Sequence, residues 1–120
     1  MQYLLLIYDA EKNIADMTEN ERARLMADYN AFSADLAKSG NLIGGNRLHD
    51  VAKATTVRVR EGKPQVTDGP FAETREQLGG FYLIEAKDLD EATKIAARIP
   101  SVKLGSIEIR PIVVYPIGVM

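Results

Sequence analysis

A short apolar run followed by the start signal of an amphipathic helix occurs twice in this chain, and this order constrains the fold more than any other feature. Residues 2–8 and 80–86 are apolar runs of the length expected for buried strands. Thr18-Glu-Asn-Glu21 is a capping-box pattern, and Asp88-Leu-Asp-Glu91 has the same logic. The sequence therefore predicts two strand–helix units.

The residues after each capping pattern predict helices near 18–39 and 88–99. In the first, the apolar positions recur at helical spacing and share one face, and Gly40 follows as a stop signal. In the second, a similar stripe ends before Pro100, which cannot continue a helix. The two predicted stripes are Leu25, Tyr29, Phe32 and Leu36, and Leu89, Ala92, Ile95, Ala96 and Ile99.

The remaining strand candidates complete the topology. Residues 42–48 form one candidate, although Gly44-Gly45 suggests a bulge or a close backbone approach. Residues 55–60 alternate polar with apolar and are joined to 65–67 by the turn residues Glu61-Gly62, which predicts a hairpin. Residues 106–114 form the last strand, whereas 9–16 is expected to be a loop. The order predicts a single α+β domain over 1–120, a ferredoxin-like βαββαβ sandwich with an inserted β-hairpin.

Helices on one side of such a sheet leave its other face uncovered. That face is expected to be apolar, and an open apolar face of this size is unusual in a monomer. A symmetric homodimer is the expected cover. The residues assigned to this face are Leu4, Leu6 and Tyr8, Tyr82 and Ile84, and Ile112 and Val114.

Composition argues against several functional classes. The net charge of −2 is spread over interspersed acids and bases without a basic stripe, so nucleic acid is not an expected partner. The chain has no cysteine, which removes thiolate catalysis and cysteine-ligated metals and fits a reducing compartment. No run is long enough to span a membrane, and the start lacks the pattern of a signal peptide. We therefore expect a cytoplasmic protein with no metal and no cofactor.

The single histidine, His49, lies beside Asp50 in the loop before the hairpin. One interpretation is a general base oriented by a carboxylate. The other, which we favour, is a solvated loop histidine, because adjacent residues rarely reach the required geometry and no nucleophile is indicated.

The non-periodic segment from Asp68 to Tyr82 is the main candidate for a site, since long irregular connections in small domains usually carry function. In Asp68-Gly-Pro-Phe71 the Asp can form an Asx-turn and Pro70 fixes the direction in which Phe71 leaves. The motif is then either a well-made turn or part of a binding site, and the charged Glu73 nearby favours the site.

Two charges on the last strand, Glu108 and Arg110, alternate with isoleucines and must project from one sheet face. They are either ligand or pairing groups in a dimer-facing cavity, or a surface salt bridge on an edge strand. The predicted ligand-binding set is Asp68, Phe71, Glu73, Tyr82, Glu108 and Arg110, and no catalytic residue is assigned.

With these segments laid out, the chain resembles the YCII-related superfamily, specifically the branch named for the motif at Asp68–Phe71. The similarity covers residues 3–8, 42–45, 54–58, 67–74, 76–82 and 107–111. The resemblance implies a ferredoxin-like protomer in a dimeric α+β barrel-like assembly, with a cleft between sheet and partner. Some superfamily members use a histidine–aspartate pair on aromatic ring compounds, but Tyr29 stands where their histidine lies, so that dyad is not carried over.

Two functions of different classes follow from these observations. The first is a homodimer that binds an aromatic or acidic small molecule in a sheet-lined cleft, with any acid–base chemistry carried by carboxylates. The second is a non-catalytic interaction module, because members of this branch are commonly encoded beside extracytoplasmic-function sigma factors. A pocket lined by Tyr82, Asp68 and Arg110 would favour the first, and a filled core with an exposed Phe71 would favour the second.

Overall fold

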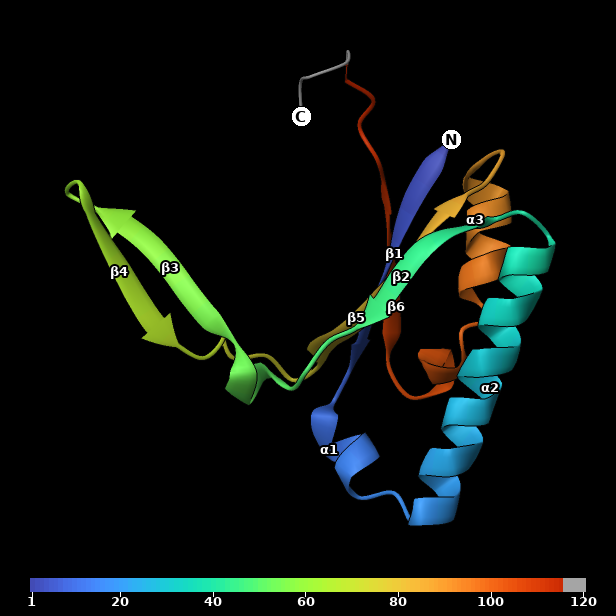
Figure 1. Ribbon diagram of the computed structural model, residues 1–120, viewed down its shortest axis with the longest axis horizontal. Coiled ribbons are helices and arrows are strands. Elements are labelled where there is room, and N and C mark those ends of the chain that lie inside the picture. Colours follow the sequence, from blue (N-terminus) through green and yellow to red (C-terminus); the bar gives the residue numbers. More distant parts are fainter. Residues whose placement is uncertain (116–120) are drawn as a thin grey trace.

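The structure is a computed structural model, and it describes residues 1–115 (Figure 1). The two longer helices, α2 (Glu19–Lys38) and α3 (Leu89–Ala96), and six strands make up most of the structure, together with one five-residue helix and two short 3-10 segments. In chain order the elements are β1 (Gln2–Asp9), α1 (Glu11–Ala15), α2 (Glu19–Lys38), β2 (Leu42–Arg47), η1 (Val51–Lys53), β3 (Thr55–Arg60), β4 (Lys63–Asp68), β5 (Gln77–Glu85), α3 (Leu89–Ala96), η2 (Pro100–Lys103) and β6 (Ser106–Pro111).

Four strands form one sheet in the order β2-β5-β1-β6, and all three neighbouring pairs are antiparallel. This is the strand order of a split β-α-β sandwich. Figure 1 shows α2 and α3 on the same side of the sheet. The predicted α+β class with antiparallel sheet is confirmed.

The core lies between this sheet and the two helices. Along β1 the side chains of Tyr3, Leu5 and Ile7 alternate into it and are buried, and they meet Phe32 and Leu36 of α2. Helix α2 begins where the sequence predicts, since Thr18 and Glu21 form both hydrogen bonds of a capping box, at 3.1 and 3.0 Å. Local patterns therefore determine the main helix and the face that it buries.

One predicted loop is helical. Residues 9–16 contain α1, whose first residue is tied to distant parts of the chain: the Glu11 backbone N–H donates to Gln77 at 2.9 Å, and the Glu11 carboxylate accepts from the Val51 N–H at 2.9 Å. These contacts stabilise a turn of helix that the local sequence does not indicate.

The expected composition of the uncovered sheet face was partly wrong. Tyr82 pairs with Leu5 and Ile84 with Tyr3, so both point toward the helices. The uncovered face instead carries the alternate residues of β1 and β5, whose side chains point away from the helices. The last strand, β6, ends at Pro111, before Val114. The apolar members of the uncovered face are Leu4, Leu6, Tyr8, Leu78, Phe81 and Leu83.

Strands β3 and β4 pair only with each other, and we call residues 55–68 the arm. Glu61 and Gly62 both have positive φ, 51° and 74°, and make the turn at its tip. Figure 1 shows the arm extending away from the sandwich, on the opposite side of the sheet from the helices. None of the helices in residues 1–115 is long and apolar enough to cross a membrane.

Candidate functional site

A cleft of about 560 Å³ opens on the helix-covered side of the sheet, between α1, α2 and the end of β2. Glycines explain why the sheet leaves this space. Gly80 is buried on β5, and a Cβ added to it would lie 2.9 Å from the Asn46 carbonyl oxygen. Gly45 is similarly tight, at 2.8 Å from the Phe81 carbonyl oxygen. Both positions require glycine for the close approach of β2 and β5, and the missing side chains leave the floor of the cleft open.

Asp9 forms the inner polar group of the cleft. It continues the buried alternation of β1 and is only 7% exposed. Its Oδ1 accepts a hydrogen bond from the Asn13 side chain at 2.8 Å, whereas Oδ2 is buried and has no partner among residues 1–115. A buried carboxylate oxygen without a donor is costly for folding, and such a group calls for an explanation, such as a bound water, ion or ligand.

Two hydroxyl pairs line the wall beside Asp9. Tyr29 of α2 donates to Ser101 at 2.6 Å, and the hydroxyl groups of Ser33 and Tyr82 lie 2.7 Å apart. Tyr82 is further held by an edge-to-face contact with Phe32, with ring centroids 5.2 Å apart. These contacts fix the positions of both tyrosine rings in the cleft.

Tyr29 is kept in its neutral form. Burial raises the pKa of its hydroxyl above the ordinary value of 10.0, and the neighbouring Tyr82 and Asp9 add to this, while the Ser101 hydroxyl opposes it. Near neutral pH Tyr29 therefore presents a hydroxyl group to the cleft.

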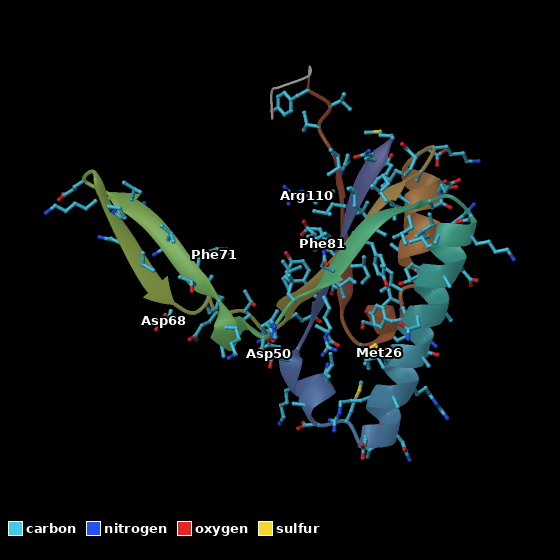
Figure 2. The ribbon with its side chains drawn as sticks, in the orientation of Figure 1. Met26, Asp50, Asp68, Phe71, Phe81 and Arg110 are labelled. Carbon is cyan, nitrogen blue, oxygen red and sulfur yellow. The ribbon has the colours of Figure 1, made fainter. Side chains whose placement is uncertain are left out.

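Charged side chains surround the mouth of the cleft. The Arg22 guanidinium donates to the Met17 carbonyl at 2.7 Å, and Arg47 lies at the end of β2. His49 and Asp50 also line the mouth and are exposed; Figure 2 shows Asp50 where the sandwich meets the arm. Within the described residues, no three His, Cys, Asp or Glu side chains cluster closely enough to hold a metal ion.

The residues predicted from the sequence occupy three different places in one chain. Tyr82 lies in the cleft. Glu108 and Arg110 form an exposed ion pair of 3.0 Å on the edge strand β6, on the uncovered face. Asp68, Phe71 and Glu73 lie at the base of the arm and just beyond it, all exposed, and Figure 2 shows Asp68 and Phe71 well apart from Arg110.

The motif at Asp68–Phe71 has a clear local role. Gly69 has φ 98°, a conformation that favours glycine, and its backbone is held on both sides. Its N–H donates to the Ala54 carbonyl at 2.7 Å, and its carbonyl accepts from the Thr56 hydroxyl at 2.7 Å. The motif thereby closes the base of the arm.

Sequence reasoning missed Asp9 and Ser101. The sequence does contain a signal for Asp9, because Asp9 is a charged residue at the next inward position after Tyr3, Leu5 and Ile7. Ser101 carries none, since it reaches Tyr29 only through the packing of η2 against α2.

Comparisons with known proteins agree with this architecture. The signature of the YCII-related domain matches residues 1–116, and the chain belongs to that family. An uncharacterized protein, R00369 of Rhizobium meliloti (strain 1021), is 38% identical over 120 residues, which cover 98% of this chain and 97% of that protein. The assignment to the branch named for residues 68–71 stays a prediction.

Among solved structures, 5-chloro-2-hydroxyhydroquinone dehydrochlorinase (TftG) from Burkholderia phenoliruptrix AC1100 is similar in fold. The TM-score is 0.54 at 17% identity, over 92% of each chain, and that structure is a complex with 2,5-dihydroxybenzoquinone. At this identity the likeness supports a shared fold.

Proposed function

We propose that this protein binds a small hydroxylated organic molecule in the cleft, with Asp9 Oδ2 accepting a hydrogen bond from a ligand hydroxyl. The observation that carries the proposal is the buried, unpartnered carboxylate oxygen that lines an otherwise well-formed cavity. A ligand donor would replace the hydrogen bond that Asp9 loses on folding. Pockets with apolar walls and a few convergent polar groups are the usual small-molecule sites of proteins.

An aromatic ligand fits the walls of this cleft. Ile7, Leu25 and Met26 supply apolar surface, and the rings of Tyr29 and Tyr82 lie beside it. TftG, the solved structure with a similar fold, holds the hydroxylated ring of 2,5-dihydroxybenzoquinone. That likeness supports a ring-bearing ligand for this chain.

Any proton transfer in the cleft would use a carboxylate. Tyr29, a neutral hydrogen-bond donor, lies on the long helix α2. The family resemblance puts a histidine at this position in other members of the superfamily. Asp9 would accept the proton of a ligand hydroxyl, and Tyr82 would donate to the developing charge while the Ser33 hydroxyl donates to Tyr82. The proposal assigns binding and leaves the reaction open.

Binding of hydroquinone to the Asp9→Asn variant tests this proposal. The substitution keeps the shape of the side chain but replaces the acceptor with an amide, so calorimetry should show a dissociation constant roughly ten- to a hundredfold higher. Asp28→Asn is the matched control, because Asp28 is exposed on α2 outside the cleft. Equal affinities of the wild-type protein and Asp9→Asn would contradict the proposal.

We also propose that the protein acts as a cytoplasmic homodimer that buries the uncovered sheet face in a barrel-like assembly. The apolar side chains of Leu4, Leu6, Phe81 and Leu83 support this, since they form one side of the central strands. Light scattering that gives only a 13.2 kDa particle would contradict the dimer.

A second function, an interaction module of a regulatory system such as that of an extracytoplasmic-function sigma factor, is favoured by one observation. Phe71 is 78% exposed at the base of the arm, and isolated exposed aromatics are common anchors of protein interfaces. Phe71→Ala should then abolish partner binding while leaving hydroquinone binding unchanged.

A further inference from the structure

The two ends of the cleft differ in charge. Asp9 at the inner end is buried and can only accept hydrogen bonds when ionised. Arg47 at the outer end is exposed, and within residues 1–115 it forms no ion pair. A ligand that fills the cleft would therefore meet an acceptor at one end and a guanidinium at the other.

The sheet register places these two side chains on the same surface. Arg47 pairs with Gly80, and Gly80 pairs with Ile7, which lies two residues before Asp9 on β1. All of these positions face the helix-covered side, and Gly80 contributes no side chain between them. Two strand spacings across and two residues along the sheet separate the Arg47 and Asp9 Cα atoms by about 12 Å. Side chains stand roughly perpendicular to a sheet, so the two head groups are separated by a distance similar to that of the Cα atoms. One para-substituted aromatic ring with a hydrogen bond of about 2.8 Å at each end has a comparable length.

The other charged groups facing the cleft are already engaged or lie at its rim. The Glu11 carboxylate accepts from the Val51 N–H at 2.9 Å, and the Arg22 guanidinium donates to the Met17 carbonyl at 2.7 Å. His49 and Asp50 stand exposed at the mouth, as Arg47 does. The Arg22 guanidinium is held by the Ile14 and Met17 carbonyls, whereas the Arg47 guanidinium has no ion pair within residues 1–115. Arg47 is therefore the cation that we assign to a ligand anion, since guanidinium groups bind carboxylates by paired, charge-assisted hydrogen bonds.

Resting on the proposed function, we infer that the ligand is an aromatic hydroxy acid, bound with its hydroxyl on Asp9 and its carboxylate on Arg47. The reverse orientation would place a carboxylate against the buried Asp9 anion and leave Arg47 facing a hydroxyl. A ring with only a hydroxyl would use the inner end alone, and a ring with only a carboxylate would leave Asp9 unpartnered. The cleft therefore selects for both groups on opposite sides of one ring.

Calorimetry with three probes, para-hydroxybenzoate, phenol and benzoate, tests this inference. The wild-type protein should bind para-hydroxybenzoate at least tenfold more tightly than either of the others. Arg47→Gln should weaken para-hydroxybenzoate roughly ten- to a hundredfold and leave phenol unchanged, since only the carboxylate contact is lost. Arg24→Gln, which removes an exposed arginine of α2 outside the cleft, is the control and should change neither.

The outcomes separate this inference from the proposed function. If phenol and para-hydroxybenzoate bind equally well and both are weakened by Asp9→Asn, the proposed site stands and the assignment of a carboxylate to Arg47 is overturned. If Asp9→Asn leaves both affinities unchanged, the proposed function fails and this inference fails with it. Unfolding curves of each variant identify any loss of binding that comes from misfolding.

Discussion

The sandwich and the arm are built from similar strands but are held in different ways. In the sandwich, every second side chain of β1 is buried against the helices, and the core includes Leu5 and Leu36, neither of which is exposed at all. In the arm, every residue of β4 is exposed, and Val57, Val59 and Val66 form an apolar face that nothing in residues 1–115 covers. The sandwich is stabilised by its own core, whereas a two-stranded sheet is marginally stable alone.

The cleft belongs to the sandwich, although it lies beside the start of the arm. Its inner polar group comes from β1 and its wall from α2, and only its rim at residues 46–50 and 77 leads toward the arm. In the functions proposed above, the ligand binds within the sandwich, and the exposed Phe71 at the base of the arm would contact a regulatory partner.

Truncating a side chain in the core of the sandwich should cost much more stability than truncating one in the arm. Leu36→Ala removes a fully buried side chain and should lower the free energy of unfolding by about 2–5 kcal/mol. Val66→Ala removes a side chain that is 67% exposed and should change it by less than about 0.5 kcal/mol. Urea denaturation of both variants at a concentration where the protein is monomeric measures the difference. A loss for Val66→Ala comparable with that for Leu36→Ala would show that the arm is part of the same core.

Adding one methyl group to the floor of the cleft should cause the next largest loss of stability. The Cβ of Gly80→Ala would lie 2.9 Å from the Asn46 carbonyl oxygen, so β2 and β5 must separate, at a cost of about 1–3 kcal/mol. Gly44→Ala is the control on the same pair of strands, because nothing lies within 4 Å of its added Cβ. Thermal unfolding compares the two, and equal melting temperatures would contradict the close approach.

Asp9→Asn should make the protein more stable while it weakens ligand binding. The wild-type side chain buries a carboxyl group with one unpartnered oxygen, so its replacement by an amide should raise the free energy of unfolding by about 1 kcal/mol. Asp28→Asn should leave it unchanged. A loss of stability in Asp9→Asn would show that the carboxylate is a structural group and would remove the main argument for the site.

The pH dependence of Tyr29 gives the smallest expected effect. Because the pKa of Tyr29 is raised in the folded protein, its contribution to stability is complete below pH 10.0 and is lost as the pH rises through the folded-state pKa. The wild-type protein should therefore lose more stability than Tyr29→Phe between neutral pH and the pH range above 10.0. Unfolding curves at several pH values measure this, and parallel profiles would contradict the environment assigned to Tyr29.

The sequence predicts the helices and strands well because their signals are local. The capping box at Thr18 and the alternation of residues 3–7 need no knowledge of the rest of the chain. The predicted site depended instead on where the segment after Asp68 would run. That prediction put Asp68 and Glu73 in one ligand-binding set with Glu108 and Arg110, but β3 and β4 carry the start of the segment away from the sandwich.

The cleft residues were harder to predict, because register brings them together. The bulges between Leu42 and Gly44 and between Ile7 and Tyr8 decide which side chains of β2 and β5 face the helices. Shifting either pairing by one residue would turn Arg47 or Tyr82 to the opposite face. No local pattern fixes that choice, so Tyr82 is the one predicted residue that lies in the cleft.

The most direct test of the central claim, that ligands bind in the cleft at Asp9, is to follow backbone amide chemical shifts by NMR during titration with hydroquinone. We expect the largest changes at Ile7, Asp9, Tyr29 and Gly80, with little change at Asp68–Glu73 and Glu108–Arg110. Shifts confined to those last two segments, with the cleft amides unmoved, would contradict that claim.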